Sequence, residues 1–497
     1  MLFHNHNTVV QDYARVCDLL AVRVFRTMAA NRARRYLIQG DKGKWEVCIG
    51  LEIHAQILAQ TKLFSSAWSQ KKNRGLRTQG GGRPNSHVAL VDAAFPGMLP
   101  VLNAECVDQA IRTGAALNCK IQERSIFERK HYFYCDLPQG YQITQQRAPI
   151  AIDGGFKIDE DTFIRINRIQ LEQDSGKSVH DLKPLSTLVD LNLAGAGLME
   201  IVLEPDLRSP LEADLVVRHL QHLLRHIGVC DGQMEEGSMR CDLNVSVRPV
   251  TDPEAPFGDR VEVKNMNSIR GIREAADYEA KRQVKEIESG NEIFRETRTF
   301  DAISGSTRRM RKKEGAKDYR FFPEPDLLPL VLSREQITSA VRSIPELPHD
   351  QAKRLMKDYG LGCYEANVLV QEHGAVKYFE EVAAHPRRSN KLVCNWLIND
   401  IFGLLKATST TILSCPITSE RLGSLIDLIS NKTISGKIAK DLLQVMFYED
   451  SRMPLEIVTE RSWSQVTDPK EVQLLCKIVV EDPVSASRIG FIIRNVD

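Results

Sequence analysis

Two side chains that suit a metal or proton site, Glu52 and His54, lie two positions apart within residues 45–54. The odd positions of this segment are apolar and most even positions are polar, which is the period-two pattern of a half-buried strand. On such a strand Glu52 and His54 project from the same face, roughly 6 to 7 Å apart. A carboxylate and an imidazole in this arrangement can hold a divalent cation or share a proton. A solvent-facing sheet surface gives the same pattern, so the pair alone leaves both interpretations open.

Other predicted strands add carboxylates and bases to their polar faces. Residues 198–204, 239–248 and 260–264 alternate in the same way, and in 162–178 the apolar positions shift from even to odd, which predicts a bulge or twist. A merely hydrated face does not need this density of ionisable groups. Carboxylates with one histidine suit Mg²⁺ or Mn²⁺, and interleaved cations suit the phosphates of a nucleotide bridged by that metal. The polar positions include Glu172, Asp174, Glu200, Glu204, Arg240, Asp242, Glu262 and Lys264.

Three cations of this region, Lys177, Arg240 and Lys264, are the expected ligands of the nucleotide's phosphates. Lys177 lies in a Gly-Lys-Ser sequence that is similar to the end of a phosphate loop. Position 171 is leucine where that motif requires its first glycine, so we reject a P-loop.

Two further segments are rich in positive charge. Residues 127–134 mix aromatic and charged side chains, which form either a stacking surface or core rings whose flanking bases reach the solvent. Residues 308–313 are a basic cluster that we expect in a solvated loop.

Apolar stripes at helical spacing predict helices at about 104–118, 211–227 and 269–289. From about residue 335 the pattern becomes helical throughout. A linker containing Cys415 and Pro416 divides this part in two. The expected segments there are 349–359, 361–384, 389–406, 418–448 and 454–480.

The composition sets broad limits. A chain of 497 residues is too long for one core and suggests two to four domains. The net charge of +1 points to no particular partner, and no apolar run reaches the roughly 18 residues of a membrane span. The 11 cysteines form no C-x-x-C pair, which argues against a structural zinc site or a disulfide framework.

Residues 1–44 differ from the rest of the chain. Between Tyr13 and Gly40 arginines are frequent and the only acid is Asp18. This composition is typical of an organelle transit peptide, so we expect import into the mitochondrial matrix and removal before about residue 45. The alternative is a disordered basic leader on a cytosolic protein.

A series of motifs closely resembles the B subunits of the glutamyl-tRNA(Gln) amidotransferases. The motifs follow one another in the family's order and cover nearly everything after residue 44, which makes the resemblance specific. They are GLEIH at 50–54, PGMLPVLN at 96–103, RKHYFY at 129–134, LEQDSGKS at 171–178, DLN at 190–192, EPD at 204–206, EEGSMRCD at 235–242, DYRFFPEPD at 318–326 and TISGKIAK at 433–440.

The resemblance implies an α+β fold in three parts. Residues 45–334 would form a cradle domain with a largely antiparallel sheet, similar to the catalytic fold of glutamine synthetase. An all-helical domain at 335–410 and a helical tail at 411–497 would contact tRNA. In the family the segment resembling 488–493 is followed by one or two further helices, so we expect an incomplete tail and a lower affinity for tRNA than with the tail restored.

The resemblance also implies a reaction. ATP phosphorylates the side-chain carboxylate of glutamate mischarged on tRNA(Gln), and ammonia from glutamine hydrolysis in a partner protein displaces the phosphate. The partners would be the amidase (A-type) subunit and the small (C-type) subunit of the same amidotransferase, in a heterotrimer that needs no membrane. No amidase nucleophile motif occurs in this chain, so glutamine hydrolysis must lie elsewhere.

By motif, the implied metal ligands and catalytic residues are Glu52, His54, Glu172 and Glu200, with ATP and Mg²⁺ (or Mn²⁺) as cofactors. Lys130 lies where the family's ammonia path meets the cradle. Gln173 stands on that path where many bacterial members have glutamate, so a charged gate is in doubt.

The zinc cysteines of some members are also absent, because Ser65 and Ser66 occupy their positions. We therefore expect no zinc. Two other classes stay open: a non-catalytic tRNA-binding scaffold that keeps the fold, and a free-standing ligase that uses ammonia directly. Retention of all four ligand positions favours the enzyme.

Overall fold

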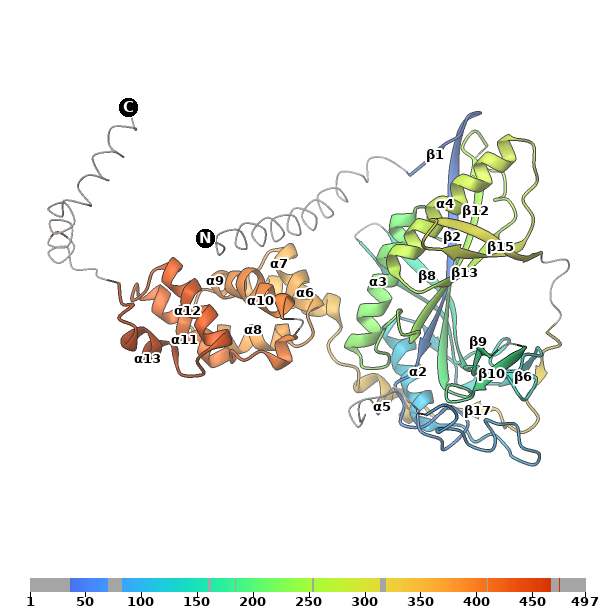
Figure 1. The fold of residues 1–497 in the computed structure, drawn as a ribbon, viewed down its shortest axis with the longest axis horizontal. Helices are drawn as coiled ribbons and strands as arrows, with labels where there is room; N and C mark the ends of the chain where they lie inside the picture. Colours follow the sequence, from blue (N-terminus) through green and yellow to red (C-terminus); the bar gives the residue numbers. More distant parts are fainter. Residues whose placement is uncertain are drawn as a thin grey trace. The chain divides into compact units, whose positions relative to one another are not determined.

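The computed structural model describes residues 36–69, 83–159, 162–183, 185–252, 254–312, 319–408, 410–465 and 473. The chain divides into two compact units between Leu347 and Pro348, and Figure 1 shows the elements of each. The expected leader lies outside the described residues up to position 35, as do the end of the predicted helix 454–480 and the segment 488–493.

The first unit is built on a ten-stranded sheet in the order β15-β14-β13-β12-β2-β11-β8-β7-β3, with β1 also paired to β2. The pairing of β13 with β14 is parallel, and the other pairings of this sheet are antiparallel. The expected α+β class with a largely antiparallel sheet is therefore confirmed. The strands are β1 (Ile38–Gln39), β2 (Lys44–Gln56), β3 (Lys120–Ile121), β7 (Ala151–Lys157), β8 (Phe163–Gln173), β11 (Gly197–Leu203), β12 (Met239–Pro249), β13 (Val261–Met266), β14 (Glu296–Asp301) and β15 (Ser306–Lys312).

The fold begins before residue 45, where the leader was expected to end. Ile38 pairs with Trp45 across β1 and β2 and is buried in the main core. The Tyr36 hydroxyl donates a hydrogen bond of 2.8 Å to Asp277 of helix α4. Residues 36–44 are thus part of this unit. The basic composition of the sequence before them did not reveal that Ile38 is a buried strand residue.

The apolar sides of the central strands pack on helices. Val47, Ile49 and Leu51 are almost fully buried, in one cluster with apolar residues of α2, α3 and α4. Side-chain caps from Asn103, Ser209 and Ser268 start these helices. The helices are α2 (Ala104–Ala116), α3 (Pro210–His226), α4 (Ile269–Glu288) and α5 (Arg334–Arg342).

The predicted irregularity within 162–178 is a register shift in β8. Arg168 lies opposite Val202 and Ile166 opposite Leu203, so Asn167 is an extra residue on this strand. Such a bulge reverses the inward positions from even to odd. As a consequence Gln170 and Glu172 point away from the helices.

Three small sheets adjoin the large one. They comprise β5 (Glu128–His131) with β6 (Tyr141–Thr144) and β16 (Phe322–Pro323), β9 (Lys177–Lys183) with β10 (Ser186–Asp190), and β4 (Arg124–Ser125) with β17 (Leu330–Val331).

The prediction of a solvated basic loop at 308–313 is wrong for residues 308–312, the part that the structure describes. Residues 306–312 form β15, which pairs with β14. Arg308 lies 2.6 Å from Asp301, and Arg309 forms an ion pair with the buried Glu296. Carboxylates on β14 stabilise the arginines of β15, whose sequence alone is typical of a loop. Edge strands commonly carry such charged residues.

The second unit is helical and has one core. The core joins residues from Ala352 to Val458, across the linker that separated two helical parts in the sequence. Helix α5 packs in the first unit, so that unit extends past the expected limit at residue 334. The helices are α6 (Pro348–Tyr359), α7 (Cys363–Gln371), α8 (Ala375–Ala383), α9 (Asn390–Asn395), the π-helix Trp396–Ile401, α10 (Phe402–Ala407), the 3₁₀ turn Ile412–Ser414, α11 (Ser419–Ser430), α12 (Gly436–Tyr448) and α13 (Pro454–Glu460).

Two long helical predictions are each divided in the structure. The segment 361–384 breaks between Gln371, the last residue of α7, and Gly374, which precedes α8 with a φ of 88° that is favourable for glycine. The segment 418–448 breaks between α11 and α12. Within the described ranges, no helix has the length and apolar character needed to cross a membrane.

Candidate active site

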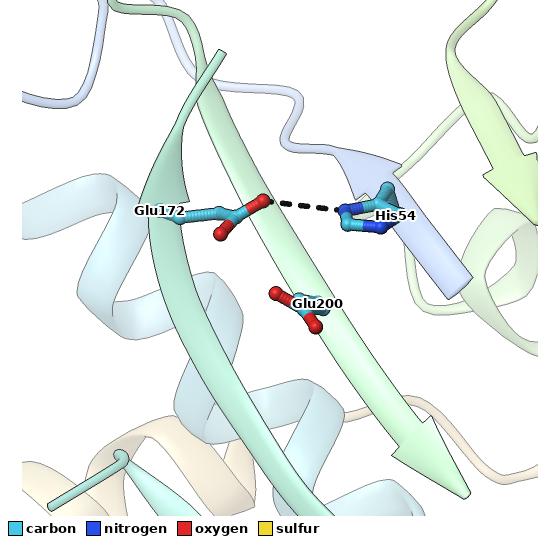
Figure 2. A group of neighbouring side chains, drawn as sticks. All are labelled: His54, Glu172 and Glu200. Atoms are coloured by element: carbon cyan, nitrogen blue, oxygen red, sulfur yellow. Dashed lines mark ion pairs between the residues drawn. The ribbon is translucent and has the colours of Figure 1, made fainter. Parts of the chain in front are cut away.

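His54, Glu172 and Glu200 come together on the face of the sheet opposite the helices (Figure 2). His54 of β2 is paired with Glu200 of β11, and Glu172 lies one strand further on β8. The His54 Nδ1 atom is 3.2 Å from Glu172 Oε1. One ligand atom from each of the three side chains lies within 4.8 Å of the others. This spacing suits three ligands of one cation.

Two polar side chains orient the carboxylates. Gln170 donates from Nε2 to Glu200 Oε2 at 2.8 Å and to the Thr144 hydroxyl at 3.1 Å. The Thr144 hydroxyl donates to Glu172 Oε2 at 3.3 Å. All four side chains are almost fully buried. The carboxylates are therefore held by fixed donors and not by mobile solvent.

The charges of the three groups are strongly coupled. Burial, together with repulsion from Glu172, raises the pKa of Glu200 to about 7. Burial disfavours the charged form of His54, but the hydrogen bond to Glu172 and the charge of Glu200 outweigh it and raise its pKa to about 9. Burial likewise opposes ionisation of Glu172, whereas His54 and Lys130 together lower its pKa to about 2. The two carboxylates repel each other at close range, and this repulsion is what a bound cation relieves.

Glu52, the fourth expected ligand, belongs to a second group. On β2 it lies opposite Val202 on one side and Asp242 on the other. Ligand atoms of Glu52, Asp242 and Glu262 lie within 4.8 Å of one another. The Lys264 ammonium is 2.6 Å from Asp242 and 3.3 Å from Glu262. Three of the four expected ligands thus form one group, and Glu52 lies in the adjacent one.

The expected phosphate-binding cations have different surroundings. Arg240, paired with His54 across β12 and β2, donates to Asp174 at 2.8 Å, and its side chain is 45% exposed. Lys264 lies in the second acidic group. Lys177 is exposed at the start of β9. Arg240 and Lys264 therefore lie beside the two groups, whereas Lys177 lies on the adjoining hairpin.

Lys130 and Gln173 are both beside the site. The positive charge of Lys130 helps to lower the pKa of Glu172, and it offsets part of the rise in the pKa of Glu200. Gln173 is buried, and its Oε1 accepts the Ile143 backbone N–H at 3.0 Å while its Nε2 donates to Gln139 at 3.3 Å. Gln173 thus fastens β6 to β8, where main-chain pairing is missing.

The sequence did not point to Gln170 or Thr144 as site residues, nor did it assign Asp242 and Glu262 to a ligand group. The alternation of the strands placed Asp242 and Glu262 on the polar face. Only the register of β2 against β12 shows that Asp242 adjoins Glu52. No sequence pattern indicates that Thr144 lies at the site, because it reaches the site from a separate sheet.

Comparisons with known proteins agree on one family. Residues 47–338 match the family described as "GatB/GatE catalytic domain", and residues 377–487 match "GatB domain". The chain belongs to the GatB/GatE family. The matched catalytic domain contains every residue of the two acidic groups.

Three relatives illustrate the family. The chain is 52% identical to the mitochondrial glutamyl-tRNA(Gln) amidotransferase B subunit of Phytophthora infestans, over 92% of this chain and 91% of that protein. It is 48% identical to the aspartyl/glutamyl-tRNA(Asn/Gln) amidotransferase B subunit of Paramagnetospirillum magneticum, over 90% of both. The protein of the same name from Acidiphilium cryptum is 51% identical over 87% of both.

Proposed function

We propose that this chain is the ATP-using component of a mitochondrial glutamyl-tRNA(Gln) amidotransferase. It would activate the side chain of glutamate mischarged on tRNA(Gln) and convert it to glutamine with ammonia from a partner. Family membership supports a tRNA-dependent amidotransferase role, and the name of the Phytophthora relative supports mitochondria. The finer assignment rests on one observation: the buried group of His54, Glu172 and Glu200.

A carboxylate needs activation before ammonia can replace its oxygen, because that oxygen is a poor leaving group. Phosphorylation by ATP supplies the leaving group, and positive charge around the phosphates lowers the barrier to phosphoryl transfer. Lys264 contacts the second acidic group, and Arg240 is paired with His54 across β12 and β2, so both would bind the phosphates. Lys130 lies close enough to Glu172 and Glu200 to orient the incoming substrate carboxylate.

The donor set fits Mg²⁺ or Mn²⁺. Carboxylate oxygens with one imidazole are ligands that these ions accept. Burial and then repulsion from Glu172 raise the pKa of Glu200, which also indicates a place for positive charge. When bound by His54, Glu172 and Glu200, such an ion would neutralise charge on the phosphates of ATP. Glu52, Asp242 and Glu262 adjoin this group and would hold a further cation or a water shell.

Ammonia would come from partner proteins. The chain has no amidase nucleophile motif. We therefore propose the amidase (A-type) and small (C-type) subunits as partners in the mitochondrial matrix, with glutamyl-tRNA(Gln) as the substrate. A scaffold without catalysis would not need two carboxylates buried beside a histidine, since burying charged groups is costly even when they are paired.

Co-expression with the amidase and small subunits, followed by an assay of tRNA-dependent ADP release, tests this proposal. In the His54→Ala assembly we expect ADP release with glutamyl-tRNA(Gln) to fall by roughly 10²-fold or more, while the partner amidase still hydrolyses glutamine. Added Mg²⁺ or Mn²⁺ should restore part of the rate by mass action. His180→Ala is the control, because His180 is exposed on β9 and contacts Thr187. A normal rate of glutaminyl-tRNA formation in His54→Ala would show that the metal assignment is wrong.

A further inference from the structure

A run of aromatic rings leads from the surface to the catalytic carboxylates. Tyr132 lies edge-on to Tyr134 with ring centroids 5.7 Å apart, and 6.5 Å from the ring of Tyr319. Tyr319 lies 5.9 Å from the ring of Phe321. These residues come from the turn after β5 and from the segment before β16, two strands that lie in one small sheet. We call Tyr132, Phe133, Tyr134 and Tyr319 the aromatic turn.

The outer part of this turn is unusually exposed. Phe133 is 85% exposed and Tyr134 is 55% exposed, whereas Phe127 at the start of the same sequence run is 2% exposed. The Phe133 ring lies against Gly140, where an added Cβ atom would be 3.1 Å from the ring. The run 127–134 therefore combines a core ring at one end with a stacking surface at the other. Exposed neighbouring rings of this kind commonly mark a binding surface.

The inner part of the turn contacts β6, which adjoins the site. The Tyr132 hydroxyl donates to Gln142 at 3.4 Å, on the strand that carries Thr144. Burial and the charges of Glu172 and Asp174 raise the pKa of Tyr132. The Lys130 ammonium lies 5.4 Å from the centroid of the Tyr319 ring. Gln142 in turn donates to the backbone carbonyl of Gln173, the neighbour of Glu172, so the rings lead toward the buried carboxylates.

Positive charge accompanies the rings. Arg129 lies over the Tyr141 ring at 4.1 Å, although its charge is balanced by ion pairs with Glu324 and Asp326. Exposed Lys177 lies between Gly176 and Ser178, which both hydrogen bond to Asp136 in the same turn. Rings beside cations are the usual means of binding single-stranded nucleic acid, since bases stack on the rings and phosphates contact the cations.

We propose that the aromatic turn binds the unpaired 3′ end of aminoacyl-tRNA by stacking its bases on Phe133 and Tyr134. This inference rests on the proposed function. The amino acid is esterified to the terminal nucleotide of tRNA, so a base stacked on the outer rings brings its glutamyl group toward Tyr132 and Glu172. The adenine of ATP is a weaker candidate, because small nucleotides bind in concave pockets and Phe133 protrudes.

The test compares Phe133→Leu, which loses the aromatic face, with Phe133→Trp, which keeps it. Phe294→Leu is the matched control, since Phe294 is 54% exposed in the segment between α4 and β14. Each is measured in the assembly with its partner subunits. Phe133→Leu should raise the Kd for uncharged tRNA(Gln) and the KM for glutamyl-tRNA(Gln) by roughly 5- to 100-fold, with the KM for ATP unchanged. Phe133→Trp and Phe294→Leu should match the unaltered chain.

A shortened tRNA adds a direct comparison. Removing the unpaired 3′ nucleotides should weaken binding to the unaltered assembly more than binding to Phe133→Leu, since the two changes remove the contact with Phe133 in common. Three results would overturn the proposal: an unchanged Kd for tRNA, a raised KM for ATP alone, or a loss of glutamine-supported amidation while ammonium-supported amidation persists. The last would indicate that a partner protein covers the rings. Because Kd is measured without turnover, a failure of the proposed function leaves this test decisive.

Discussion

Replacing Glu200 by glutamine should make the metal-free fold more stable at neutral and alkaline pH. Glu200 is 6% exposed and faces a second carboxylate, and its pKa is raised from 4.5 to about 7. The stability contributed by its proton is full below pH 4.5 and is lost as the pH rises to about 7. A difference of one pKa unit corresponds to about 1.4 kcal/mol. The rise from 4.5 to about 7 therefore means that ionised Glu200 lowers the free energy of unfolding by roughly 3 kcal/mol at pH 8.

Glutamine has nearly the same shape and cannot ionise, so Glu200→Gln avoids this cost. Calorimetric unfolding with a chelator should show the variant more stable than the unaltered chain by about 2 to 3 kcal/mol at pH 8, with the difference vanishing near pH 4.5. Mg²⁺ should then stabilise the unaltered chain and not the variant. Glu204→Gln is the control, because Glu204 is half-buried just beyond β11 and accepts from Asn167. A Glu200→Gln chain that is less stable at pH 8 without metal would refute the reasoning.

Three other predictions concern the rest of the chain. Lys62→Met should lower the free energy of unfolding by about 3 kcal/mol, because it leaves the buried Asp92 without its ion-pair partner at 2.9 Å; chemical denaturation measures this, and an unchanged midpoint would contradict it. Gln173→Glu should keep amidation within a few-fold, since Oε1 still accepts the Ile143 N–H, whereas a complete loss would show that the neutral side chain is required. Residues 1–35 fused to a reporter should direct it to mitochondria, and a cytosolic reporter would refute the leader assignment.

The strands of the site were predictable because each has one apolar face that is buried in the main core. Period-two alternation reports that burial directly, and it identified the direction of Glu52, His54 and Glu200. The bulge in β8 was predictable for the same reason, since a change of phase is the sequence trace of an extra residue.

The grouping of ligands was not predictable from alternation. Residues two positions apart on one strand share a face but lie roughly 6 to 7 Å apart. Which residues lie next to them on the adjacent strands depends on the register of the pairing. The pairing of His54 with Glu200, and of Glu52 with Asp242, places them in separate groups. Charge pattern was also misleading at β15, where cross-strand carboxylates balance a basic segment that resembles a loop.

The central claim is that this chain transfers a phosphoryl group to the glutamyl side chain before ammonia attacks. The most direct measurement labels the side-chain carboxylate of glutamyl-tRNA(Gln) with ¹⁸O and follows the label during amidation by the reconstituted assembly. If the carboxylate is phosphorylated, its oxygen leaves with the phosphate, so the inorganic phosphate released should carry ¹⁸O in step with glutaminyl-tRNA formation. Unlabelled phosphate accompanying glutaminyl-tRNA would contradict the account.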